Sequence, residues 1–163
     1  MKKLILATAL LSAFSVQAEQ KKVELSLDNL YVGGSFSNNV IDSPFGGGSV
    51  DAFGISAFAG YELDNDIEQV MTAVEAGYSQ TEDFTRNNDI NGLWVSAVAQ
   101  KQLPEIDPRL SAMARIGIDF GDDDGIFMGA GAAFRIIEQV EVRAEYINKD
   151  ATTVYQASGV FKF

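Results

Sequence analysis

The chain has 163 residues, with 12 Lys and Arg against 23 Asp and Glu, and its formal net charge is −11 at pH 7. This surplus of negative charge argues against nucleic acid as a partner, because proteins bind phosphate backbones through Lys and Arg. The sequence holds no Cys and no His, which excludes a disulfide framework, a thiolate metal site and histidine-based catalysis. We therefore expect neither a metal ion nor another cofactor.

The N-terminus reads MKKLILATALLSAFSVQAEQ, in which two lysines precede an apolar run and a small-residue ending at Ala18. This is the layout of a secretory signal peptide, and the run is shorter than the roughly 20 apolar residues that a membrane-spanning helix needs. We predict a cleaved signal peptide over residues 1–18, export through the inner membrane, and one folded domain over residues 19–163.

Segments of alternating apolar and polar residues, separated by clusters of Gly, Asn, Asp and Pro, recur from residue 30 to the C-terminus. Such alternation is typical of β-strands, in which successive side chains point to opposite faces. In chain order, the predicted strands are residues 30–37, 51–62, 68–79, 91–102, 109–120, 126–136, 140–148 and 152–163. The sequence thus predicts an all-β fold, an eight-stranded antiparallel up-and-down transmembrane β-barrel or a soluble barrel of the same pattern.

The connections between these strands differ at the two ends of the barrel. After odd-numbered strands they are mostly the longer ones, at residues 38–50, 80–89, 121–125 and 148–151. After even-numbered strands they are short turns, at residues 63–66, 103–107 and 137–139. Long loops at one end and tight turns at the other are typical of outer-membrane barrels, whose short turns face the periplasm.

The two faces of the strands help to decide between a soluble carrier, with an apolar interior, and a membrane barrel, with an apolar exterior. On the polar face, small residues alternate with a few long charged ones, as in Ala73, Glu75 and Gly77. A narrow lumen needs this mixture because side chains must fill it. The opposite face lacks Asp, Glu and Arg in several strands, which suits hydrocarbon, where a charge costs about 2–4 kcal/mol at the midplane.

Aromatic residues on the apolar face fall into two groups if the odd-numbered strands run outward. The group near the long loops is Phe36, Phe53, Tyr78, Phe120, Tyr146 and Tyr155, and the group near the turns is Tyr61, Phe134, Phe161 and Phe163. Two aromatic girdles are typical of membrane barrels, so we predict a barrel in the outer membrane. Trp94 is an exception, because the register that turns Leu93 and Val95 to lipid points Trp94 inward.

The predicted inward face carries nearly balanced charge. Its charged residues are Arg115, Arg135, Arg143 and Lys162 against Glu62, Glu75, Asp119, Glu141 and Glu145. Because an isolated buried ion is very costly, we expect these side chains to pair inside the barrel. Two interpretations stay open: a polar plug that fills the lumen, which we favour, and a gated ion path.

Six segments resemble the eight-stranded transmembrane domain of the outer membrane protein A and X families of Gram-negative bacteria. They are YVGGSF (31–36), ISAFAGYEL (55–63), VEAGY (74–78), ARIG (114–117), VRAEY (142–146) and SGVFKF (158–163). The resemblance implies an ionic cluster across the lumen that contains Glu75 and Arg143, with Arg115 and Glu145 as neighbours. Alternation places Glu141 on the same face as Arg143, and these five residues form the predicted structural cluster.

The C-terminus completes the resemblance. Phe163, with Phe161 two residues before it, looks like the signal that the barrel-insertion machinery reads. The sequence ends there without the peptidoglycan-binding domain of outer membrane protein A, so we do not expect tethering to the cell wall.

The loops are where we expect specific function, because the strands are committed to lipid on one face and to lumen packing on the other. The charged loop residues are mostly acidic: Asp42, Glu82, Asp83, Asp89, Asp122, Asp123, Asp124 and Asp150 against Arg86 and Lys149. We predict a structural or adhesion-like role at the cell surface. The alternative is a narrow porin-like channel for ions or small solutes.

The expected partners are outer-membrane lipid and lipopolysaccharide, the barrel-insertion machinery, and host or other surface ligands, and we expect a monomer. A lipid-modifying or other enzyme is not expected, because the small barrel enzymes activate a serine or a water with histidine, which this chain lacks. The GDDDG segment at residues 121–125 offers carboxylates to a divalent cation but lacks the spacing of a calcium loop. We interpret it as a solvated acidic loop.

Overall fold

The structure is a computed structural model that describes residues 26–42, 49–83, 89–150 and 152–163. The predicted signal peptide lies outside these ranges. A short 3-10 helix, η1 (Leu27–Asn29), precedes the strands β1 (Leu30–Asp42), β2 (Ser49–Leu63), β3 (Val70–Thr81), β4 (Asn91–Gln102), β5 (Leu110–Asp119), β6 (Gly125–Ile137), β7 (Val140–Asn148) and β8 (Thr153–Lys162).

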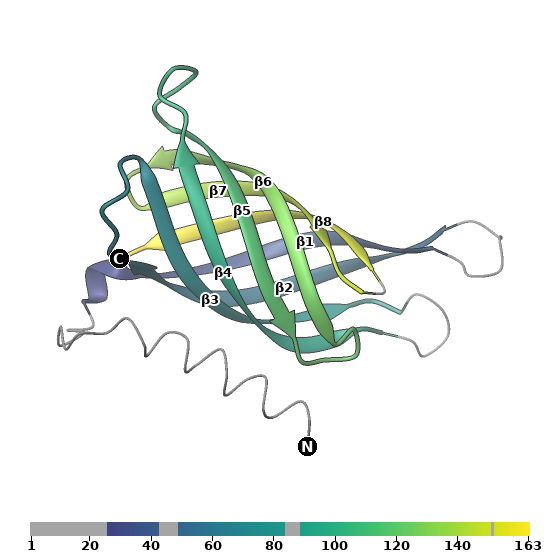
Figure 1. The fold of residues 1–163 in the computed structure, drawn as a ribbon. Coiled ribbons are helices and arrows are strands. Elements are labelled where there is room, and N and C mark those ends of the chain that lie inside the picture. The colour runs from purple at the N-terminus through teal and green to yellow at the C-terminus, as the bar shows by residue number, and fades with distance from the viewer. Residues whose placement is uncertain (1–25, 43–48, 84–88, 151) are drawn as a thin grey trace.

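The strands close into one barrel in the order β1 to β8 (Figure 1). Each strand is antiparallel to its neighbours, and Tyr31 of β1 pairs with both Gly60 of β2 and Lys162 of β8. The chain therefore adopts the predicted all-β, eight-stranded up-and-down barrel. Among the described residues, no helix is long and apolar enough to cross a membrane.

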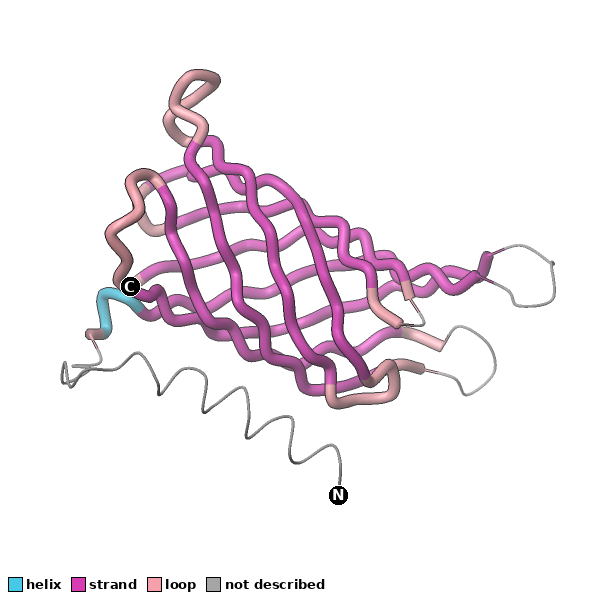
Figure 2. Tube along the Cα trace, in the orientation of Figure 1, coloured by secondary structure: helices cyan, strands magenta, loops and turns pink. Residues whose placement is uncertain are grey.

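The hairpin of β1 and β2 is longer than the sequence predicts. β1 continues to Asp42 and β2 begins at Ser49, with Val40 paired to Asp51 near the tip. The polar residue Asn38 interrupts the alternation of β1, but backbone pairing continues through it. Figure 2 shows these two strands extending beyond their neighbours at one end of the barrel.

Exposure alternates along the strands, so one face of the wall looks into the lumen and the other looks outward. In β4, for example, Leu93 is 63% exposed and Trp94 is 6% exposed. Trp94 thus lies in the lumen, and β4 has the register that turns Leu93 and Val95 outward.

The C-terminus lies beside η1 at the end of the barrel that carries the short turns (Figure 2). The backbone N–H of Phe163 donates to the carbonyl of Leu30 over 3.3 Å. The N–H of Ser26 donates to the Tyr61 hydroxyl, also over 3.3 Å. These bonds hold both ends of the described chain to the turn end of the barrel.

Candidate functional site

The centre of the lumen holds an ionic cluster of the five residues that the sequence singled out. They come from β3, β5 and β7, where alternation points every second side chain inward. Glu75 lies between two cations, with its Oε1 2.5 Å from Arg143 Nη1 and its Oε2 3.0 Å from Arg115 Nη2. Arg115 Nε lies 2.7 Å from Glu145 Oε1, and Arg143 Nε lies 2.8 Å from Glu141 Oε1. All five side chains are buried.

Neutral side chains complete the cluster. The Tyr31 hydroxyl donates to Glu75 Oε1 over 2.7 Å, and Gln100 Nε2 donates to Glu141 Oε1 over 3.0 Å. With all members ionised, three carboxylates face two guanidinium groups, so these neutral donors help to stabilise the excess negative charge. Among the described residues, Arg143 Nη2 is a buried nitrogen without a hydrogen-bond partner.

The sequence reasoning missed Tyr31 and Gln100. Both lie at inward positions, and Tyr31 belongs to the YVGGSF segment that carries the family resemblance. Only the register across several strands brings them to the cluster, since the bonded partners are 44 and 41 residues apart in the sequence.

An aromatic layer lies next to the ionic cluster on the loop side. The Trp94 ring centre is 5.9 Å from that of Phe58 and 6.4 Å from that of Phe127, and Arg115 Cζ lies 5.5 Å from the Trp94 ring. Inward glycines make room for these rings, because a Cβ at Gly77 or Gly117 would overlap Trp94 or Phe127. The small residues of the polar face therefore accommodate large neighbours, as the mixed pattern predicted.

A small cavity lies in the lumen between this layer and the loop end. The space open to the centres of water molecules is about 40 Å³, room for a few waters. Asn39, Thr81 and Thr152 contribute polar groups to its wall, and Trp94 and Arg115 also line it. The cavity thus reaches the ionic cluster from the loop side.

Towards the turn end, the lumen holds a second cluster of buried apolar side chains, those of Val98, Met113 and Ala133. Beyond it, Lys162 Nζ lies 2.5 Å from Glu62 Oε1, so these two predicted inward charges pair. Arg135, also predicted inward, is half-buried and joins no ion pair among the described residues. A register shift between Arg135 and Ile137 interrupts the ladder there.

Three charged residues that we expected to be free for partners instead hold the loop end of the barrel together. Lys149 Nζ lies 2.6 Å from Asp119 Oδ2, and the Thr152 hydroxyl donates to Asp123 Oδ2 over 2.5 Å. Asp122 Oδ2 accepts a hydrogen bond from the backbone N–H of Asn91 over 3.1 Å.

The interpretation of residues 121–125 as a solvated acidic loop is therefore wrong for Asp123, which is only 4% exposed and accepts from Thr152. Asp122 stays exposed, as that interpretation predicts, while it accepts from Asn91 of β4. Within the described ranges, no group of three or more acidic residues is arranged to hold a metal ion.

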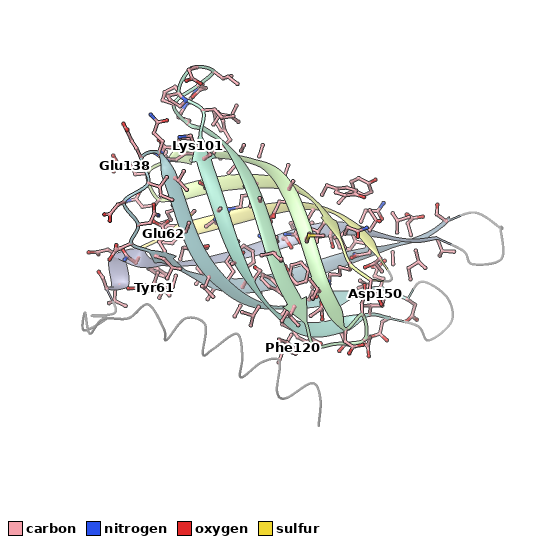
Figure 3. The ribbon with its side chains drawn as sticks, in the orientation of Figure 1. Tyr61, Glu62, Lys101, Phe120, Glu138 and Asp150 are labelled. Atoms are coloured by element: carbon pink, nitrogen blue, oxygen red, sulfur yellow. The ribbon has the colours of Figure 1, made fainter. Side chains whose placement is uncertain are left out.

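The structure places the predicted girdle residues on the outer wall. Those near the loops are exposed: Phe36, Phe53, Tyr78, Phe120, Tyr146 and Tyr155. Near the turns, Phe161 and Phe163 are exposed, and Tyr61 and Phe134 are half-buried. Figure 3 shows Tyr61 and Phe120 at opposite ends of the barrel.

The barrel is closed, with apolar and aromatic residues outside and paired charges inside. These features define the class of transmembrane β-barrels, in which the closed sheet pairs all of its backbone hydrogen-bonding groups. The sequence profile of the family described as "Outer membrane protein beta-barrel domain" matches residues 6–158. The chain belongs to this family.

Solved structures of similar fold cover most of the chain. A de novo designed transmembrane β-barrel is 17% identical with a TM-score of 0.58, covering 83% of this chain and 96% of its own. Neisserial surface protein A is 17% identical with a TM-score of 0.55, covering 83% and 97%. Ail, the attachment invasion locus protein of Yersinia pestis, is 16% identical with a TM-score of 0.51, covering 82% and 96%. No curated protein matches the chain. At these identities, the likeness shows the fold alone.

Proposed function

We propose that this outer-membrane barrel acts at the cell surface through its loops, and that its lumen is a structural plug. The observation that carries the proposal is the buried network across the lumen, where Glu75, Arg115 and Arg143 pair beside the Trp94 layer. The strands therefore face lipid on one side and this network on the other. The loops are the part of the molecule left to meet a partner.

The loop end faces the exterior in this proposal, and the short turns face the periplasm. At the loop end, Glu82, Asp83, Asp89 and Asp150 are exposed acidic residues outside the contacts that hold the mouth together. Their charge favours cationic surfaces, or divalent cations that bridge to anionic lipopolysaccharide. The name of Ail, the attachment invasion locus protein, associates a barrel of similar fold with attachment.

The test removes negative charge from one end of the barrel at a time. The loop variant combines Glu82→Gln, Asp83→Asn, Asp89→Asn and Asp150→Asn. The matched control makes the same change in charge at the turns, with Asp64→Asn, Asp66→Asn, Glu105→Gln and Glu138→Gln, all exposed residues. Figure 3 shows Asp150 and Glu138 at opposite ends of the barrel.

Adhesion of intact cells that carry each variant is measured on cultured host cells and on polylysine-coated beads. We expect the loop variant to lose adhesion several-fold and the turn variant to match the wild type, because only the loop end is reachable from outside. Wild-type adhesion by the loop variant, with both variants folded, would remove the surface proposal.

The second candidate function is a narrow ion path, which the cavity that reaches Arg115 from the loop side favours. Planar-bilayer recordings separate the two functions. A plugged lumen predicts no stepwise conductance from the wild-type protein. Stepwise conductance that changes in a Glu75→Gln variant would favour the channel instead.

We further propose that the protein is not an enzyme, because it has no histidine to activate a serine or a water.

A further inference from the structure

The outer wall carries a shallow, open groove of about 680 Å³ near the loop end, across β6, β7, β8, β1 and β2. Its floor contains Ala144 and Ala157, which pair with each other across β7 and β8. Two aromatic pairs border it: Phe36 with Phe53, with ring centres 5.9 Å apart, and Tyr146 with Tyr155, 5.5 Å apart. The groove forms because the aromatic rings extend farther from the wall than the small alanine side chains between them.

The position of the groove identifies the chemistry of its occupant. The aromatic pairs belong to the outer surface that the family places in a membrane, so the groove is continuous with the surface that contacts lipid. A groove left empty in hydrocarbon would forfeit dispersion contacts along its floor and walls. An acyl chain is the lipid part that fits between apolar walls.

A polar group lies at the loop side of this groove. Asn38 is exposed on the outer face of β1 and pairs across the ladder with Tyr155 of β8. Glu145 also lines the groove, but Arg115 holds its carboxylate inside the barrel. No Lys or Arg is among the described lining residues. An amide and phenol hydroxyls without a cation fit sugar hydroxyls better than a bare phosphate.

A second outer groove provides the comparison. It measures about 780 Å³, with Tyr78, Leu93 and Phe120 around a floor that includes Ala59 and Ala76. No amide side chain lines it among the described residues. Its one phenol hydroxyl, that of Tyr78, donates to Asn91 Oδ1 over 3.4 Å, so this polar group already has a partner in the protein. The second groove thus offers a similar apolar shape without an amide among its described lining residues.

We propose that the groove over Ala144 and Ala157 binds one acyl chain of a sugar-headed lipid, with Asn38 and Tyr155 hydrogen-bonded to the sugar. The lipid belongs to the outward-facing leaflet, so the inference rests on the proposed orientation of the loops. The second groove contacts acyl chains without selecting the head group.

The test uses the mature protein in phosphatidylcholine vesicles that contain dephosphorylated lipid A with a photoreactive diazirine in one acyl chain. After irradiation, mass spectrometry maps the crosslinks along the strands. We expect crosslinks to concentrate on β7, β8 and β1. Ala144→Phe should reduce them several-fold by filling the groove, whereas Ala76→Phe should leave them unchanged because it fills only the second groove.

The head group is tested separately with Asn38→Leu, which removes the amide and leaves the groove open. This variant should lose crosslinking to the lipid A probe several-fold and keep crosslinking to phosphatidylethanolamine with the same diazirine chain. Each variant is first checked for the gel shift of a folded barrel.

Crosslinks spread evenly around the wall, or equal yields from both lipids in wild type and Asn38→Leu, would overturn the proposal. The crosslinks do not depend on adhesion, so a failure of the groove and a failure of the proposed surface role are distinguishable.

Discussion

At the scale of the residue, we expect the removal of a lumen arginine to destabilise the barrel more than the removal of a lumen glutamate. The cluster pairs three carboxylates with two guanidinium groups, so Arg143→Met leaves Glu141 without a cation and leaves Glu75 with Arg115 alone. We expect this variant to lose about 3–5 kcal/mol of unfolding free energy, because unpaired buried charges are costly. Glu75→Gln should cost less, since each arginine keeps a carboxylate of its own. Urea unfolding in lipid vesicles measures both.

The pair of Lys162 and Glu62 is the matched control, because its side chains are 23% and 28% exposed and remain partly hydrated. Glu62→Gln should change stability by no more than about 1 kcal/mol. Equal losses from Arg143→Met and Glu62→Gln would show that the central cluster has no special structural role.

The residues of the cluster differ in how well the sequence predicts them. Alternation alone turns Glu75 and Arg143 inward, and the need to pair buried charges brings them together. Tyr31 is a mainly apolar side chain, and nothing in the neighbouring sequence shows that its hydroxyl donates a hydrogen bond to Glu75. Asp123 was assigned to a solvated loop and Lys149 to a loop that is free to contact a partner, because a loop sequence does not show where its side chains turn back.

At the scale of the element, one turn contains a non-glycine residue with a positive φ, a backbone conformation that is unfavourable for a residue with a side chain. Gln69, between β2 and β3, has φ 61°, the left-handed region that favours glycine, and its carbonyl accepts a hydrogen bond from Gln102 N–H over 2.9 Å. We expect Gln69→Gly to raise the unfolding free energy by about 0.5–1 kcal/mol, because glycine adopts this conformation without a steric cost. The urea midpoint measures the change.

The neighbouring Glu68→Gly is the control, because Gln69 is the only non-glycine residue with positive φ among the described residues. Glycine at position 68 adds flexibility to the unfolded chain without relieving strain, so it should lower stability. A midpoint that falls in both variants would contradict the role assigned to the backbone of Gln69.

Elements were predicted best where alternation is uninterrupted. β7 was predicted at residues 140–148 and spans Val140–Asn148. β1 was predicted to end at residue 37 because polar residues follow, yet its ladder with β2 continues to Asp42. Backbone pairing does not require an apolar face once a hairpin has left the hydrocarbon, so side-chain pattern underestimates such strands.

At the scale of the whole molecule, closure of the sheet can be predicted from the sequence, but the positions of the grooves on its outer wall cannot. Eight alternating strands with an apolar outer face must close to remove their edges in lipid. The grooves depend on which strands become neighbours, since Phe36 lies beside Ala157 only because β1 pairs with β8. That pairing joins the two ends of the chain, where local pattern carries no information.

The same closure makes a prediction about the intact protein. Every strand is paired on both sides, so detergent cannot peel one away without breaking two ladders at once. We expect the mature protein to fractionate with the outer membrane and to migrate differently on a gel before and after boiling in dodecyl sulfate, because the unheated barrel stays folded. Phe163→Ser is the companion variant, and it should lower the amount of folded protein if the C-terminal aromatic residue is the insertion signal.

A wild-type protein recovered in the periplasm without detergent would contradict the membrane assignment. Membrane-bound protein that migrates identically on the gel before and after boiling would contradict the predicted resistance of the barrel to unfolding.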